Sequence, residues 1–310
     1  MKHPIKLTIL LMAMFIITQL IGLYVVNFYL ADTSTIPFGF DQKELVDQSP
    51  NFGLQFLVSF ITSFILALLI IMLFMKLNAK WILKAWFFIV IAIALGISFN
   101  VILIQTKIIY ATSIALGIGL VLAFFKMFRP NPLIHNLTEL LIYPGIAAIF
   151  VVMLNWWITI ILLILISIYD IWAVWHSGVM QKMAKYQIES IGVLGGFMIP
   201  YASKKIKEKI RLLRLKYKNM KIPNGVIKKQ KIKVALAILG GGDVVFPIIA
   251  AGVFLKTLGI IPALCVTAGA SLALLYLFTI AKKKKYYPAM PYLTTGIFAG
   301  MIIGYILTLI

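Results

Sequence analysis

The sequence predicts an all-α fold, a polytopic membrane helix bundle with nine transmembrane helices, and three observations support it. First, 62% of the 310 residues are hydrophobic, only 12% are charged and the mean hydropathy is +1.03, which excludes an ordinary soluble domain. Second, nine apolar runs approach or exceed the roughly 20 residues that a helix needs to cross a bilayer. Third, Lys and Arg gather in alternate connections between these runs. With no linker between folded units, residues 1–310 are predicted to form one transmembrane domain.

The nine runs divide into a group of six and a group of three. Spans 1–6 occupy residues 1–177, a basic loop occupies 178–232, and spans 7–9 occupy 233–310. The first run begins like a secretory signal, but it is longer than a signal core of about 7–15 residues, so we interpret it as a permanent helix. The predicted spans are residues 7–30, 52–75, 82–104, 108–128, 134–154, 157–177, 233–255, 259–281 and 288–310.

Loop charge predicts the orientation of the bundle. Each basic connection falls on one side, and the first connection on the other side is acidic. Because positively charged loops remain in the cytoplasm, the N-terminus is predicted to be cytoplasmic and the C-terminus outside. The basic residues on the cytoplasmic side include Lys76, Lys80, Lys84, Lys126, Arg129 and Lys282 to Lys285.

The long basic loop carries much of the formal net charge of +20. From Gln181 to Lys233 it holds fifteen Lys and Arg residues against two Glu. Within 204–217 the apolar residues recur on one helical face, which is typical of a basic amphipathic helix. Such a helix binds anionic lipid headgroups, and we prefer this interpretation to nucleic-acid binding. The apolar stretch 191–201 is too short to cross the bilayer and is predicted to be interfacial or re-entrant.

Two acidic residues lie deep inside predicted spans, although the whole chain has only nine Asp and Glu. These two residues are Asp170 and Asp243. Because burying a carboxylate at bilayer depth costs several kcal/mol, their presence there favours a functional role. The structural alternative is that neighbouring Tyr, Ser or Trp side chains satisfy each of them. Glu139 lies near the start of a span, where Lys126 or Arg129 could reach it, and we interpret it as structural.

Asp170 and Asp243 are predicted to lie at the same depth. They are about seven and about ten residues from the cytoplasmic ends of spans 6 and 7, which corresponds to roughly 10–15 Å. Two neighbouring carboxyl groups cannot both ionise cheaply, so the pair would share one proton. The ionised group could then activate water while the neutral group protonates a carbonyl oxygen. Gly240, Gly241 and Gly242 would let a partner helix or a substrate backbone come close.

These residues carry a resemblance to a known family. Tyr169-Asp170, Gly240-Gly241-Gly242-Asp243 and Pro288-Ala289-Met290-Pro291 resemble the Y-D, G-x-G-D and P-A-L motifs of presenilins and signal peptide peptidases, with Met290 in place of Leu. The nine spans and the long loop after span 6 resemble the same family. The resemblance implies an intramembrane aspartyl protease of a prokaryotic cell membrane, with Asp170 and Asp243 as catalytic residues and no metal or cofactor. It also implies helical transmembrane segments or signal peptides as substrates.

Two prolines within four residues would expose main-chain groups at Pro288 to Pro291, where an unwound substrate could pair through its backbone. The alternative is an ordinary proline start of the last helix. Behind this motif, Gly296, Gly300 and Gly304 recur every four residues and predict a close helix contact.

Other functions remain possible on the sequence alone. A prepilin-type leader peptidase also carries G-x-G-D, and an ion- or proton-coupled transporter could use two acids as a relay. A scaffold without catalysis is a further alternative. The single Cys265 and the absence of an H-E-x-x-H pattern argue against a metal site.

Overall fold

The computed structural model describes residues 5–31, 52–77, 79–129, 131–177, 195–201, 235–281 and 287–309. Within these ranges nine helices are long and apolar enough to cross a membrane, which confirms the predicted helical membrane bundle. In chain order the elements are α1 (Ile5–Ala31), α3 (Phe52–Lys76), α4 (Lys80–Gln105), α5 (Ala111–Phe128), α6 (Pro132–Met153), α7 (Trp156–Trp172), a π-helical turn (Ala173–Ser177), β1 (Gly196–Tyr201), β2 (Ala235–Gly240), α11 (Gly241–Leu258), α12 (Ile260–Ile280) and α13 (Met290–Leu307).

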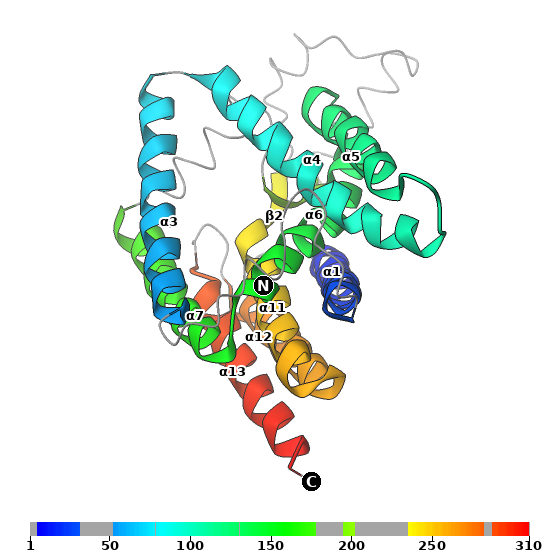
Figure 1. Ribbon diagram of the computed structural model, residues 1–310. Coiled ribbons are helices and arrows are strands. Elements are labelled where there is room, and N and C mark those ends of the chain that lie inside the picture. The colour runs from blue at the N-terminus through cyan, green and yellow to red at the C-terminus, as the bar shows by residue number, and fades with distance from the viewer. Residues whose placement is uncertain are drawn as a thin grey trace.

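Helix α11 lies at the centre of the bundle (Figure 1). It packs against α1, α6, α7, α12 and α13, and its residues from Pro247 to Leu255 are all buried. The main hydrophobic core therefore surrounds α11, whereas a smaller cluster fills the contact between α4, α5 and α6. A helix that is buried on every side can hold a functional group away from lipid, and α11 carries Asp243.

The glycine face predicted for the last span is confirmed by the contact between α12 and α13. A Cβ atom on Gly296 or Gly300 would overlap the backbone carbonyl of Gly269 or Cys265, and one on Gly304 would lie 2.8 Å from Cα of Pro262. Only residues without a side chain allow these two helices to approach so closely. This contact fixes the position of α13 along most of its length.

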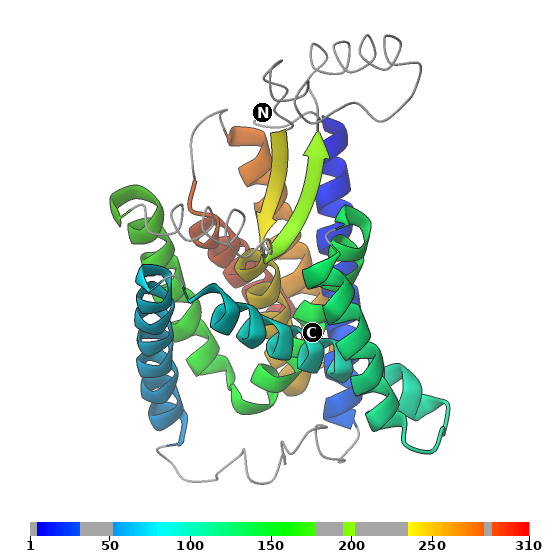
Figure 2. The same cartoon turned by 90° about the horizontal axis from the view of Figure 1, so that it is seen from above.

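Strands β1 and β2 form a two-stranded antiparallel ribbon that the sequence analysis did not predict. The register runs from Gly196 opposite Gly240 to Tyr201 opposite Ala235. Figure 2 shows the two strands side by side, with β2 running directly into α11. In β2 the side chains of Ala237 and Leu239 are buried while that of Ile238 is 40% exposed, which is the two-residue period of a strand.

The ribbon corrects the predicted seventh span, which begins at Gly241 and not at residue 233. Hydropathy alone includes residues 235–240 in the helical span, because a short apolar run does not distinguish a strand from a helix. The glycines at 240–242 disfavour continuation of a helix, and pairing with β1 satisfies the backbone of the strand instead. Part of the predicted interfacial stretch 191–201 is β1, whereas the predicted amphipathic helix 204–217 lies outside the described residues.

Candidate active site

Asp170 lies near the end of α7, and its side chain is 8% exposed. The backbone amide of Met290 donates a hydrogen bond to Oδ2 of Asp170 over 3.0 Å. The amide of Ala289 also interacts with this carboxyl group. These amides belong to the start of α13, whose first N–H groups have no partner within the helix. Asp170 therefore caps a helix that begins 120 residues later in the chain.

The Pro288-Ala289-Met290-Pro291 motif forms the beginning of α13. Ala289 is the N-cap residue, and Pro291 stands in the first turn, where its missing N–H costs no hydrogen bond. The side chains of Pro288 and Met290 are buried. One turn further along, the hydroxyl groups of Ser167 on α7 and Thr294 on α13 lie 2.8 Å apart and form a second polar link between the two helices.

Asp243 lies in the first turn of α11, so its predicted position ten residues inside the span is wrong. Gly240 is the N-cap residue of this helix, and the carboxyl group of Asp243 folds back over it and interacts with its backbone amide. A Cβ atom on Gly240 would lie 3.1 Å from Oδ2 of Asp243. An acid at the third helical position commonly reaches back in this way, and the positive end of the helix dipole favours its charge.

The structure brings the two aspartates together. Helix α11 packs against both α7 and α13, and the carboxyl groups of Asp170 and Asp243 interact electrostatically. Each carboxyl group lies at the N-terminus of a helix: Asp170 at α13 and Asp243 at α11. These two helix ends stabilise negative charge, while the proximity of the carboxyl groups opposes a second charge. The arrangement is suited to a pair of acids that holds one proton.

The remaining predicted site residues lie around this pair. Tyr169 is half-buried and its ring lies 6.3 Å from that of Trp172. The ring end of Tyr143 on α6 packs over Gly241, where a Cβ atom would come within 2.9 Å of its hydroxyl oxygen. Gly242 is exposed. Among the described residues, no group of three or more His, Cys, Asp or Glu side chains is arranged to hold a metal ion.

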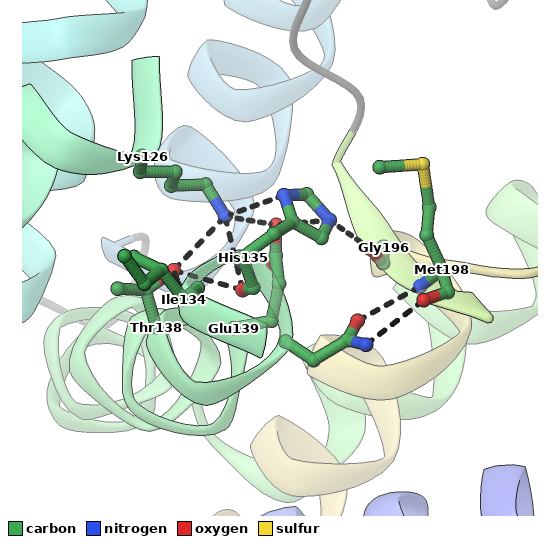
Figure 3. A network of polar contacts seen from close by, with 8 residues as sticks. Lys126, Ile134, His135, Thr138, Glu139, Gly196 and Met198 are labelled. Carbon is green, nitrogen blue, oxygen red and sulfur yellow. Dashed lines mark hydrogen bonds and ion pairs between the residues drawn. The ribbon is translucent and has the colours of Figure 1, made fainter. Parts of the chain in front are cut away.

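Gln19 on α1 is a polar residue near Asp243 that the sequence analysis did not identify. It is fully buried, and its Nε2 atom donates to the carbonyl oxygen of Val244, the residue after Asp243. A lone glutamine inside a 27-residue apolar helix was the available signal. Glu139 pairs with Lys126 at 2.6 Å, which confirms one of its two predicted partners. His135 belongs to the same group of contacts, which Figure 3 shows.

Comparison with known proteins places this site in context. Residues 12–310 match the family described as signal-peptide peptidase, presenilin aspartyl protease. A structure of a presenilin family intramembrane aspartate protease in space group C222 has a TM-score of 0.58 and 18% sequence identity, covering 97% of this chain and 99% of the other. A second such structure, in space group P2, has a TM-score of 0.54 and 17% identity, covering 96% of each chain. No curated protein matches the chain.

Proposed function

Because this chain belongs to the family of signal-peptide peptidases and presenilin aspartyl proteases and is an intramembrane aspartyl protease, we propose that Asp170 and Asp243 form its catalytic dyad. One observation carries the proposal. The two carboxyl groups come from different helices that pack against each other, and each carboxyl group lies at a helix N-terminus. The Y-D motif contributes Asp170, and the G-x-G-D motif contributes Asp243.

The dyad performs general acid–base catalysis with one shared proton. The ionised carboxylate removes a proton from water as the water oxygen attacks the peptide carbonyl carbon, and the neutral carboxyl group gives its proton to the carbonyl oxygen. The resulting gem-diol then breaks down. The first carboxyl group protonates the leaving nitrogen as the C–N bond breaks, and a hydroxyl group returns its proton to the second carboxylate. The products are an acid and an amine, and the dyad again holds one proton.

The start of α13 positions Asp170 by binding its carboxyl group. The amide of Met290 is already hydrogen-bonded to Asp170, so this N–H is not available to pair with a substrate backbone. The buried side chains of Pro288 and Met290 support the same role. We therefore assign the P-A-M-P motif to positioning of Asp170, in place of the direct substrate pairing predicted from the sequence.

The substrates are proposed to be helical transmembrane segments or signal peptides, which must unwind before a peptide bond reaches the dyad. An unwound segment presents unpaired N–H and C=O groups that need partners in a water-poor site. Within the described part of the chain, β1 occupies only one edge of β2, and β2 ends at Gly240, three residues before Asp243. Addition of the substrate as a further strand along β2 would satisfy its backbone and direct it to Asp243.

The orientation predicted from loop charge completes the proposal. The basic loop between α7 and α11 is placed in the cytoplasm, where its charge attracts anionic headgroups, and the C-terminus is placed outside. Asp170, at the end of α7, and Asp243, at the start of α11, then both lie toward the cytoplasmic side of the bundle.

The test is cleavage of a synthetic membrane-spanning peptide by the purified protein in lipid vesicles. Asp170→Asn and Asp243→Asn should each abolish cleavage, because an amide cannot exchange the shared proton, while thermal unfolding stays close to that of the unsubstituted protein. Asp47→Asn, in a predicted loop, is the matched control and should cleave normally. Substantial cleavage by either dyad variant would refute the assignment.

A further inference from the structure

Helix α6 presents a buried polar stripe toward the ribbon that precedes Asp243. His135, Glu139 and Tyr143 are spaced four residues apart and so lie on one face of the helix. All three are buried, with exposed fractions of 6%, 2% and 4%. Because a buried polar group is costly unless it is hydrogen-bonded, the partners of His135 and Glu139 indicate what this face of the helix holds in place.

Lys126, at the end of α5, determines how His135 can bind. Its Nζ atom lies 2.6 Å from Oε1 of Glu139, 3.2 Å from Nδ1 of His135 and 3.2 Å from Oγ1 of Thr138 (Figure 3). A lysine ammonium group only donates, so Nδ1 of His135 must accept. The proton of the neutral imidazole therefore resides on Nε2. From there it is donated to the carbonyl oxygen of Gly196 in β1, over 2.8 Å.

Asn136 binds the same strand two residues further along. Its Nδ2 atom donates to the carbonyl oxygen of Met198 over 2.8 Å, and its Oδ1 atom accepts from the amide of Met198 over 2.9 Å. The side-chain amide thus pairs with the outer edge of β1 as a neighbouring strand would. Together, His135 and Asn136 attach the backbone of β1 to α6 by three hydrogen bonds.

Strand β1 connects α6 to the backbone segment that carries Asp243. Gly196, which accepts from His135, pairs directly with Gly240, the N-cap residue of α11. Gly196 has a φ of +129°, and a Cβ atom there would overlap the carbonyl oxygen of Leu239 in β2. On the other side, Tyr143 packs over Gly241 and lies edge-on to Phe197, with ring centroids 5.9 Å apart. The backbone that presents Asp243 is therefore enclosed between β1 and α6.

We propose that His135 and Asn136, with Lys126 fixing the tautomer of His135, are positioning residues that hold the β1–β2 ribbon and thereby set the location of Asp243. This inference rests on the proposed catalytic role of Asp243. The residues act through main-chain atoms of β1 and do not touch the reacting groups. Their removal should loosen the ribbon and reduce the rate of the chemical step while the bundle stays folded.

Two substitutions at His135 give a matched pair. In His135→Gln the amide can still accept from Lys126 and donate to Gly196, whereas His135→Leu keeps the apolar volume and loses both contacts. A misplacement of about 1 Å at a catalytic group lowers the rate roughly a hundredfold, so His135→Leu and Asn136→Leu should lower kcat by that order. His135→Gln should stay within a few-fold of the unsubstituted protein. Ser98→Ala, which removes a partly buried hydrogen bond from α4 to the carbonyl oxygen of Leu141 in α6, is the control and should retain kcat.

Two further measurements separate positioning from general destabilisation. Amide hydrogen exchange in Gly196–Tyr201 and Ala235–Gly240 should accelerate in His135→Leu and Asn136→Leu but not in Ser98→Ala or His135→Gln. Binding of a peptide analogue that carries a hydroxyl group at the scissile position should weaken in proportion to kcat. Normal kcat and exchange in His135→Leu and Asn136→Leu, or equal losses in Ser98→Ala, would overturn the proposal.

These outcomes are distinguishable from failure of the dyad itself. If Asp243→Asn cleaves normally, the catalytic assignment fails and the positioning role fails with it, while the exchange experiment still decides whether the ribbon is held by α6. If Asp243→Asn is inactive and His135→Leu is fully active, only the positioning role fails.

Discussion

The amide of Met290, the first residue of α13, donates a hydrogen bond to Oδ2 of Asp170 on α7 over 3.0 Å. This contact joins two motifs that lie 120 residues apart in the chain. It gives the carboxyl group a partner that favours its ionised form and gives the helix a cap that its own sequence does not supply. A proline-containing turn without any acid or base thereby becomes part of the proposed catalytic site.

The side chain of Met290 can be changed without disturbing this amide only if its shape is retained. The side chain of Met290 is 4% exposed, and Met290→Leu conserves its volume and apolarity. The free energy of unfolding should therefore change by less than about 1.5 kcal/mol, and the cleavage rate should be nearly unchanged. Met290→Asp places a third carboxyl group beside Asp170 and should lower kcat severely, by at least about a hundredfold. Peptide cleavage by the two purified variants checks this, and equal rates would show that the motif only begins a helix.

The hydroxyl pair between Ser167 and Thr294 should stabilise the same helix contact. Removal of one partner of a buried hydrogen bond costs on the order of 1–3 kcal/mol, so Ser167→Ala and Thr294→Val should each reduce the free energy of unfolding by about that amount. The double variant should lose less unfolding free energy than the sum of the two single losses, because both single variants remove the same hydrogen bond. Denaturant titration of the four proteins gives the coupling, and strict additivity would contradict the contact.

Gly241 should tolerate a side chain only if Tyr143 is shortened. A Cβ atom at Gly241 would lie 2.9 Å from the hydroxyl oxygen of Tyr143, so Gly241→Ala should displace the turn and lower cleavage. Adding Tyr143→Leu removes the obstructing atoms, and the double variant should cleave faster than Gly241→Ala alone. If Tyr143→Leu lowers cleavage equally with and without Gly241→Ala, the two residues do not act through this contact.

Cleavage should follow a bell-shaped dependence on pH because the dyad needs one proton between Asp170 and Asp243. At low pH both carboxyl groups are protonated and the base is lost. At high pH both are ionised and no group can protonate the carbonyl oxygen. Initial rates at saturating substrate, measured from about pH 4 to pH 9 with a check that the protein stays folded, should fall on both sides of a maximum. A flat profile would contradict catalysis by a shared proton.

The predicted orientation can be tested by cysteine labelling in a Cys265→Ser background. Ser203→Cys and Asn224→Cys, in the basic loop, should react with an impermeant reagent only from the cytoplasmic side, and Ile310→Cys only from outside. The three positions lie outside the described residues, so labelling supplies information that the fold does not. Reaction of Ser203→Cys from outside would reverse the proposed side of the dyad.

Hydropathy and charge were sufficient to predict the bundle and to single out Asp170 and Asp243, although the depth predicted for Asp243 was wrong. Length and apolarity decide whether a segment crosses a bilayer, and both are properties of a continuous stretch of chain. The glycine spacing of Gly296, Gly300 and Gly304 is also local, and the predicted close contact of the last helix is present. The two aspartates could be identified because an unpaired charge in an apolar segment is expensive wherever the segment packs.

The tertiary structure was needed for everything that depends on a distant partner. Residues 235–240 form a strand because β1 lies beside them, and an isolated apolar run of that length is compatible with either helix or strand. Asp170 caps α13, and His135 binds Gly196, through contacts between segments separated by 120 and 61 residues. Local periodicity contains no information about such pairings, because the hydrogen bonds that create them form only when the helices have packed.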